Sequence, residues 1–180
     1  LWVDSDDTFS SVFTKNIYKN YNTPIKVYNL GVRGYSVLES SYLFEKYENI
    51  YKPDIVVINL FLNDVAENYN DVMYNRLIDN SSYDSMFSYL EKINNLCNKN
   101  NIRFFISVIP CKEQLIEKNE LYFQNKVIQF SNQYNIPCLN PFKYFQNIKV
   151  DNLYFSWDPH FSKEGHYHYA KFLEKKIWAN

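Results

Sequence analysis

The amino-acid sequence predicts an α/β fold, a three-layer α/β/α sandwich in which helices cover both faces of a parallel sheet. Short runs rich in β-branched and aromatic residues are bounded by Pro, Gly or Asn, as buried strands usually are. Longer segments with helical periodicity alternate with these runs, which favours parallel strands joined by right-handed crossovers. Because 180 residues fit one core, we expect residues 1–180 to form a single domain.

About five strands are expected. The first lies directly before Ser5, and the others lie at 25–30, 54–60, 102–109 and 136–139. The three longer runs are made largely of Ile, Val, Phe, Tyr and Leu, which suit a pleated and buried surface. We therefore expect these three runs to be buried strands.

Helices are predicted between the strands, at 8–20, 36–49, 84–100, 117–134 and from Ser162 onward. Ser36 and Glu39 fit a capping box, in which each side chain binds an amide that the first helical turn leaves unpaired. The residues expected to face the core are Met86, Leu90, Ile93 and Leu96 in one helix and Tyr169, Ala170, Leu173 and Ile177 in the last helix.

Candidate catalytic residues follow the predicted strands. Ser5 comes after the first strand, Gly34 after the second and Asn63 after the third, and His160 precedes the last helix. In open parallel sheets, ligands bind beyond the carboxyl ends of the strands. The sequence therefore predicts that these residues belong to one site.

A serine hydroxyl is a weak nucleophile at neutral pH and needs a base that a third group orients. The chain has three histidines that could be this base. His166 and His168 lie two positions apart in the last helix and point about 200° away from each other, so they do not easily serve one site. His160 lies in a loop, with Asp158 two residues upstream, and we expect His160 to be the base and Asp158 to orient it.

Acyl transfer also needs hydrogen-bond donors for the oxyanion, each of which contributes about 2.7–4 kcal/mol to the transition state. Gly34 would allow a substrate oxygen to approach its backbone amide closely. The Asn63 side chain donates without adding a charge. Together with the Ser5 amide, these residues are the predicted oxyanion hole.

The order Ser5, Gly34, Asn63, His160 resembles the four sequence blocks of the SGNH (GDSL-like) hydrolases. The resemblance covers nearly the whole chain, from Val-Asp-Ser through Asn-Leu-Gly-Val-Arg-Gly-Tyr-Ser and Leu-Asn-Asp to Asp-Pro-His-Phe-Ser-Lys-Glu-Gly-His. Each motif alone is weak evidence for the resemblance, but four such motifs in the same order at strand ends are specific evidence for it. Val3 departs from the family, which usually has Gly there, and the spacing of Asp158 and His160 is that of acetyltransferase-like relatives.

This resemblance implies a flavodoxin-like sheet and an ester or acetyl-group substrate, with no metal and no organic cofactor. It implies an esterase that cleaves small O-acyl groups, acetyl above all, from a small molecule or a carbohydrate through an acyl-enzyme. If an acceptor sugar replaced water, the same residues would give an O-acetyltransferase. A non-catalytic binding domain is the alternative that Val3 raises, and a metal hydrolase using Asp158, His160 and a helical histidine is a weaker one.

Several of these residues also have a purely structural interpretation. Ser5 could cap the helix that begins near residue 8, and Asn63 with Asp64 could form a strand-exit turn in which Asp64 is structural. Gly34 could serve only a turn with positive φ, with Gly31 as the rival donor. The aromatic residues that could either stack on sugar rings or pack in the core are Tyr35, Phe61, Phe155, Trp157 and Phe161.

Composition excludes other classes of function. The net charge of −1 comes without a cluster of Lys or Arg, so we expect no nucleic-acid partner. The longest apolar run, 55–62, is far shorter than a transmembrane segment. The three cysteines lack metal-binding spacing and are expected to be buried thiols. The chain begins without Met, so we expect upstream sequence to have been trimmed, and the sequence leaves compartment and oligomeric state open.

Overall fold

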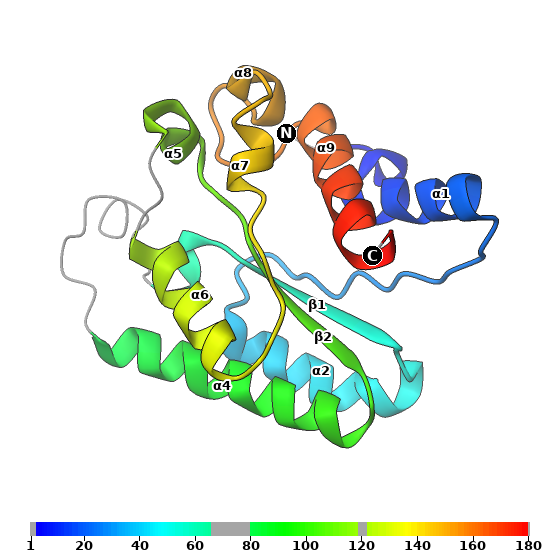
Figure 1. Ribbon diagram of the computed structural model, residues 1–180, viewed down its shortest axis with the longest axis vertical. Coiled ribbons are helices and arrows are strands. Elements are labelled where there is room, and N and C mark those ends of the chain that lie inside the picture. The colour runs from blue at the N-terminus through cyan, green and yellow to red at the C-terminus, as the bar shows by residue number, and fades with distance from the viewer. Residues whose placement is uncertain (1–2, 66–79, 119–121, 180) are drawn as a thin grey trace. The chain divides into compact units, whose positions relative to one another are not determined.

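The structure is a computed structural model that describes residues 3–65, 80–118 and 122–179 (Figure 1). Its contacts divide the chain into two compact units, which we describe separately. The helical unit comprises Leu1–Asn29, Cys111–Asn119 and Pro141–Asn180, and the sheet unit comprises Leu30–Pro110 and Glu120–Asn140. The single-domain organisation stays a prediction from the sequence.

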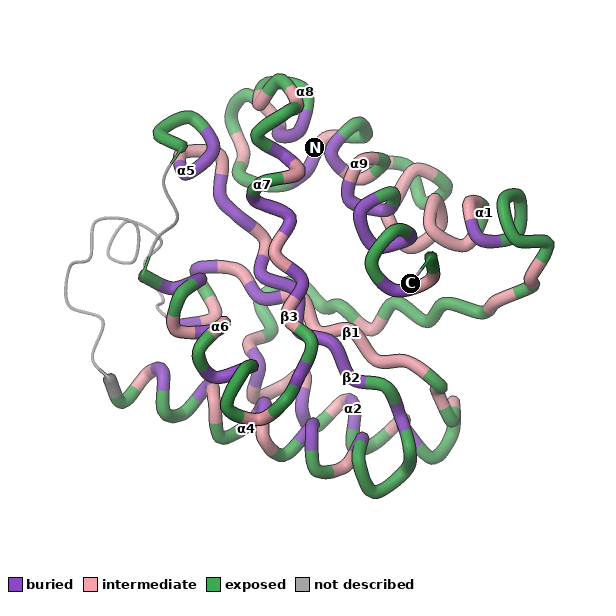
Figure 2. Tube along the Cα trace, in the orientation of Figure 1, coloured by how far each residue is buried: buried purple, intermediate pink, exposed green. Residues whose placement is uncertain are grey.

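The sheet unit contains a parallel sheet with the strand order β1 (Ile55–Leu60), β2 (Arg103–Val108) and β3 (Cys138–Leu139) (Figure 1). Ile55 lies opposite Arg103, and Ile106 lies opposite Cys138. The central strand β2 is buried along most of its length (Figure 2). The strands predicted at 54–60, 102–109 and 136–139 are therefore confirmed, and with them the α/β fold class, although β1 is half-buried rather than buried except at Leu60.

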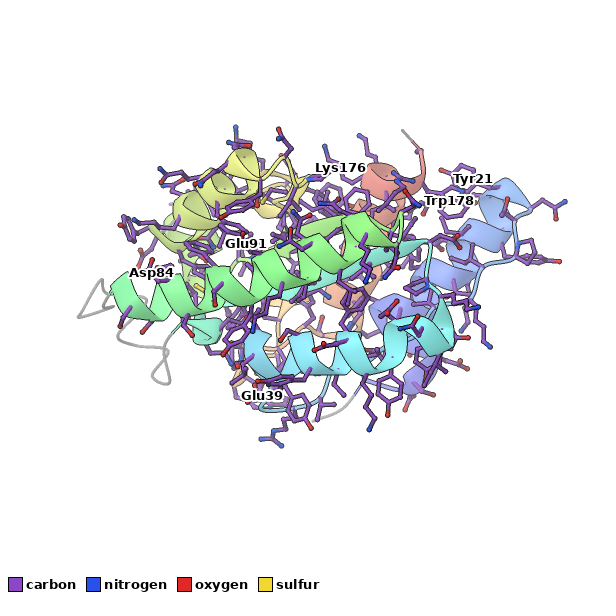
Figure 3. The ribbon with its side chains drawn as sticks, turned by 90° about the horizontal axis from the view of Figure 1, so that it is seen from below. Tyr21, Glu39, Asp84, Glu91, Lys176 and Trp178 are labelled. Atoms are coloured by element: carbon purple, nitrogen blue, oxygen red, sulfur yellow. The ribbon has the colours of Figure 1, made fainter. Side chains whose placement is uncertain are left out.

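Three long helices accompany this sheet: α2 (Val37–Tyr51), α4 (Asn80–Lys99) and α6 (Tyr122–Gln133). Helices α2 and α4 lie side by side (Figures 1 and 3), and α4 and α6 both contact β2. The Phe87 and Phe130 rings stack between α4 and α6 with their centroids 4.5 Å apart. Glu91, labelled in Figure 3, accepts a hydrogen bond of 3.1 Å from the Tyr134 hydroxyl.

The apolar face predicted for α4 is largely confirmed. Met86, Leu90 and Ile93 are buried, and the next buried position is Cys97 rather than Leu96. This spacing of four, three and four residues keeps one stripe of the helix against its neighbours. Cys97 and Cys111 are buried, as predicted, whereas Cys138 is half-buried.

The strand predicted at 25–30 is wrong, so the described residues contain three strands rather than about five. The structure assigns no helix or strand to this segment, and most of its residues are exposed. Either face of such a strand would mix apolar and polar side chains, so that neither face is a continuous apolar surface. Lys26 instead lies over the Tyr28 ring, 4.9 Å from its centroid. The strand expected before Ser5 falls on residues 1–2, outside the described residues, and on Val3.

The helical unit consists of helices and turns: η1 (Ser5–Asp7), α1 (Phe9–Tyr21), α5 (Lys112–Glu117), α7 (Phe142–Phe145), α8 (Val150–Leu153), α9 (Lys163–Leu173) and the π-helical turn η3 (Glu174–Trp178). Helices α1 and α9 pack together (Figure 1), and α8 also contacts α9. The short helices α7 and α8 lie between the strand predicted at 136–139 and the helix predicted from Ser162 onward, where we expect an irregular stretch from the sequence. The helix predicted at 117–134 is α6, which begins at Tyr122; residues 119–121 lie outside the described residues.

The last helix begins and packs as predicted. Ser162 is its N-cap residue, and its hydroxyl accepts a hydrogen bond of 3.1 Å from the Gly165 amide. The predicted inward residues Tyr169, Ala170, Leu173 and Ile177 are all buried. Among the described residues, no helix is both long and apolar enough to cross a membrane.

Candidate active site

Ser5 begins the 3-10 turn η1 and is exposed. Its carbonyl oxygen accepts hydrogen bonds from the Thr8 hydroxyl at 2.9 Å and from the Ser11 hydroxyl at 2.7 Å, which fixes the turn on the start of α1. The N-cap residue of α1 is Thr8, so the interpretation of Ser5 as the helix cap is wrong. Within the described part of the chain, the Ser5 hydroxyl makes no hydrogen bond, and none joins it to His160.

Asp158 and His160 lie together, as the sequence predicts. Asp158 Oδ1 binds Nδ1 of the His160 ring and also accepts a hydrogen bond of 2.9 Å from the His160 amide. The Asp158 side chain is 25% exposed and the His160 side chain 78% exposed. Because the carboxylate takes the Nδ1 side of the ring, Nε2 is the nitrogen that is left for proton transfer.

A short closed loop carries this pair. Tyr154 and Phe161 form an antiparallel bridge, and the Phe155 amide donates to the His160 carbonyl oxygen at 3.2 Å. Tyr154 and Phe161 are both buried, so the core of the helical unit holds the two ends of the loop. The sequence predicts only a loop here, because the bridge depends on packing that no local signal announces.

The segment that contains Ser5 is joined to the helix that follows His160. The Lys163 ammonium lies 2.8 Å from the Asp7 carboxylate. The Phe9 amide donates a hydrogen bond of 3.2 Å to Nδ1 of His166, whose ring stacks on the Phe9 ring. The ion pair thus ties η1 to the first turn of α9, and the histidine ties the start of α1 to the same turn.

The two helical histidines have different surroundings, as their spacing predicts. Burial, and then the nearby His160, lower the pKa of His166. Its neutral ring is the form that can accept the Phe9 amide. His168 instead contacts Glu164, with Nε2 and Oε1 3.2 Å apart, and the Tyr144 hydroxyl. The contact between His166 and Phe9 joins residues far apart in sequence, and no local pattern predicts it.

In the sheet unit, Gly34 lies in an exposed turn and Asn63 just after β1. The Tyr35 amide donates to the Val32 carbonyl oxygen at 3.1 Å, and Gly34 has φ +83°, which side-chain-bearing residues rarely adopt. The turn interpretation of Gly34 therefore describes its conformation correctly. Asn63 is exposed within the 3-10 turn η2 (Leu62–Asp64). The oxyanion roles of Ser5, Gly34 and Asn63 stay predictions.

A pocket of about 230 Å³ opens beside these residues within the sheet unit. Gly31, Tyr35, Phe61 and Asn63 are among the residues that line it. Gly31, the rival of Gly34 as a donor, thus shares a pocket with Asn63.

Asp64 has the structural role that the sequence predicts for it. Its Oδ2 accepts a hydrogen bond of 2.7 Å from the Phe61 amide and closes the turn after β1. Burial raises the pKa of Asp64 to about 6, although the bond from Phe61 acts in the opposite direction. The turn therefore presents Asn63 next to a carboxyl group that ionises close to neutral pH.

Within the described residues, no group of three His, Cys, Asp or Glu side chains is arranged to hold a metal ion. Asp158 and His160 lie together as a pair, and His166 Nδ1 binds a backbone amide.

No protein-family model and no curated protein matches the chain. Solved structures do resemble it. The acetyl xylan esterase AlAXEase matches with a TM-score of 0.74 and 14% identity, over 97% of this chain and 92% of its own. The acetylxylan esterase Axe2 from Geobacillus stearothermophilus matches with a TM-score of 0.72 and 18% identity, over 95% and 81% of the two chains.

A protein from Desulfitobacterium hafniense DCB-2, assigned to the G-D-S-L family of lipolytic proteins, matches with a TM-score of 0.66 and 15% identity, over 96% and 90% of the two chains. At such identities the likeness concerns the fold. The chain has the α/β fold of these acetyl xylan esterases and of the G-D-S-L lipolytic family.

Proposed function

We propose that this chain is a serine esterase that cleaves small O-acyl esters, principally acetyl groups carried by a carbohydrate. The observation that carries the proposal is the Asp158–His160 pair, in which the carboxylate binds Nδ1 of an exposed imidazole. An imidazole held in this way has Nε2 available as a general base. Ser5 begins η1, and both η1 and the first residue of α1 are tied to the helix that follows His160, through Asp7 and Phe9 respectively.

In the proposed reaction, His160 Nε2 takes the hydroxyl proton of Ser5 while Ser5 Oγ attacks the ester carbonyl carbon. Asp158 holds the ring and stabilises the imidazolium. The Ser5 amide, the Gly34 amide and the Asn63 side chain donate hydrogen bonds to the oxyanion. The intermediate then collapses, and His160 returns the proton to the departing alcohol. Water, deprotonated by His160, attacks the acyl-Ser5 ester; the bond between the acyl carbon and Ser5 Oγ then breaks, His160 returns the proton to Ser5 Oγ, and the free acid leaves.

The names of the structural neighbours support an acetyl group on a sugar. Two of them are acetyl xylan esterases, and crystallised catalytic mutants of Axe2 replace a serine or a histidine with alanine. A serine and a histidine are the residue types proposed here for the nucleophile and the base.

The test compares the wild-type chain with Ser5→Ala on p-nitrophenyl acetate and p-nitrophenyl butyrate. We expect the wild type to cleave the acetate faster than the butyrate, and Ser5→Ala to lose at least about 10³-fold in kcat. Circular dichroism checks that the variant is folded. Ser88→Ala is the matched control, because Ser88 is exposed on α4 and its hydroxyl donates to the Ser85 carbonyl oxygen of the same helix.

Equal rates in the wild type and Ser5→Ala would exclude Ser5 as the nucleophile and favour a non-catalytic binding domain. Labelling of Ser5 by a fluorophosphonate probe would oppose that alternative. Adding a free sugar to the assay distinguishes hydrolysis from acetyl transfer, because a transferase would yield a new sugar ester instead of acetate.

A further inference from the structure

Trp157 has the largest exposed fraction of the large apolar side chains in the described residues, at 72%. A single exposed aromatic residue is ordinary on a protein surface, and exposure alone assigns no role to it. The position of Trp157 is more informative, because it directly precedes Asp158 and lies two residues before His160. Phe161, by contrast, is buried and belongs to the core.

A second ring supports the indole. The Phe155 and Trp157 rings stack with their centroids 5.8 Å apart and their planes 29° from parallel. Phe155 is half-buried, and its amide is the one that donates to the His160 carbonyl oxygen. The indole is therefore supported by a neighbour that the loop itself fixes, while most of its surface faces solvent.

The same closed loop carries the Trp157 indole and the His160 imidazole and so holds them at a fixed position relative to each other. The bridge between Tyr154 and Phe161 closes the loop, and the Ser162 amide donates to the Leu153 carbonyl oxygen at 2.9 Å just outside it. Both bridge residues are buried. A ligand that lies on Trp157 therefore has a defined position relative to His160.

The chemistry of ester cleavage determines which part of a substrate reaches this position. His160 must hand its proton to the departing alkoxide, so the alcohol portion of the ester lies on the His160 side, away from the oxyanion donors. Between Tyr154 and Phe161 the only carboxylate is Asp158, which His160 engages, and the loop contains no Lys or Arg. This surface suits a neutral alcohol with a flat apolar face, as a pyranose ring has, better than an anionic one.

We propose that Trp157, supported by Phe155, is a stacking platform for the pyranose ring of an O-acetylated sugar whose ester oxygen lies at His160. The inference rests on the proposed esterase function and names the alcohol portion of its substrate. Loss of the platform reduces cleavage of sugar acetates more than cleavage of acetates of small alcohols.

The test measures kcat/KM for glucose pentaacetate and for ethyl acetate in the wild type, Trp157→Ala and Trp157→Phe. We expect Trp157→Ala to lower the ratio of kcat/KM for glucose pentaacetate to kcat/KM for ethyl acetate at least tenfold, mainly through a higher KM for the sugar ester. Trp157→Phe should keep most of the wild-type ratio. Tyr18→Ala is the matched control, since Tyr18 is also exposed but lies on α1. An unchanged ratio in Trp157→Ala would overturn the platform.

A second measurement does not depend on turnover. In the inactive Ser5→Ala chain, glucose pentaacetate should quench tryptophan fluorescence saturably, and the quench should disappear in Ser5→Ala/Trp157→Phe. A wild type that cleaves neither ester refutes the proposed function, yet a quench that depends on Trp157 would still support the platform. No quench in folded Ser5→Ala overturns the platform. A dimer that dissociates in Trp157→Ala but not in Tyr18→Ala, with no change in the ratio of the two kcat/KM values, would also overturn the platform. In that case a second copy of the chain would occupy this surface.

Discussion

Two histidines in the helical unit show how a single contact decides what a residue can do. In His160, Nδ1 faces the Asp158 carboxylate, an acceptor, which favours the tautomer with the proton on Nδ1 and the lone pair on Nε2. In His166, Nδ1 faces the Phe9 amide, a donor, so the proton lies on Nε2. His160 is therefore suited to act as a base, whereas His166 joins two segments of backbone.

This argument predicts the effect of Asp158→Asn. An asparagine keeps the size of the side chain but can present its amide to Nδ1, which favours the tautomer with the proton on Nε2. We expect kcat for p-nitrophenyl acetate to fall by about 10³–10⁴-fold with the fold intact, by analogy with serine proteases. Asp151→Asn is the matched control, since Asp151 is an exposed carboxylate that pairs with Lys112 at 3.5 Å. A rate within threefold of the wild type would show that Asp158 does not orient the base.

At this scale the sequence predicts what is local. The two-residue spacing of Asp158 and His160 already allows their contact, and the serine and glutamate of the capping box bind as predicted, with the Ser36 amide donating to Glu39 at 2.8 Å. The contact between Phe9 and His166 is not predictable in this way, because only the folded chain brings those segments together.

At the scale of elements, the close approach of α8 and α9 depends on Gly165. A Cβ atom built on Gly165 would lie 2.0 Å from the Leu153 carbonyl oxygen, which is backbone and cannot turn aside. Gly34 differs, because a Cβ there would meet nothing within 4 Å, and only its positive φ opposes a side chain. One glycine is required for space, and the other for conformation.

We therefore expect Gly165→Ala to lower the free energy of unfolding by about 3 kcal/mol or more, because helix α9 must shift. Gly34→Ala is expected to cost about 1–2 kcal/mol, since alanine tolerates positive φ poorly. Urea unfolding followed by circular dichroism measures both. Equal stabilities of Gly165→Ala and the wild type would mean that α8 and α9 do not approach as closely as described.

The elements that the sequence predicts correctly are those with a strong periodic pattern. Strand β2 and helices α4 and α9 each have an apolar run or face that matches their burial. The segment 25–30 has the composition of a strand but no uniform face, so composition misleads there. Helices α7 and α8 have four residues each, too short for periodicity to predict them.

At the scale of the whole molecule, the order of motifs predicted the fold better than any one residue did. The chain keeps the fold of AlAXEase over 97% of its length at 14% identity. Such a likeness means that patterns of burial and turns are retained while most side chains have changed. Motifs at the ends of strands can be predicted from such patterns, whereas the contacts of Trp157 with its neighbours cannot.

The stability of the whole chain should depend on pH through two half-buried groups, His166 and Asp64, whose contributions change with pH in opposite directions. The lowered pKa of His166 means that its contribution is complete above the ordinary histidine value of 6.5 and is lost as the pH falls below it. For Asp64, the folded state raises the pKa from 3.8 to about 6, so the folded chain binds a proton more tightly than the unfolded chain does. Its contribution is complete below about pH 4 and is lost as the pH rises towards 6.

Asp64→Asn should therefore stabilise the chain at pH 8 but not at pH 4. Asparagine resembles the protonated acid and can still accept the hydrogen bond from the Phe61 amide. The difference in pKa corresponds to at most about 3 kcal/mol, which appears only where the wild-type carboxyl is ionised. Thermal unfolding of both proteins from pH 4 to pH 8 measures the difference in stability between Asp64→Asn and the wild type. Asp84→Asn is the control, because Asp84 is exposed on α4. A difference in stability that is constant with pH, or that grows towards pH 4, would show that burial does not hold the Asp64 carboxyl in its neutral form.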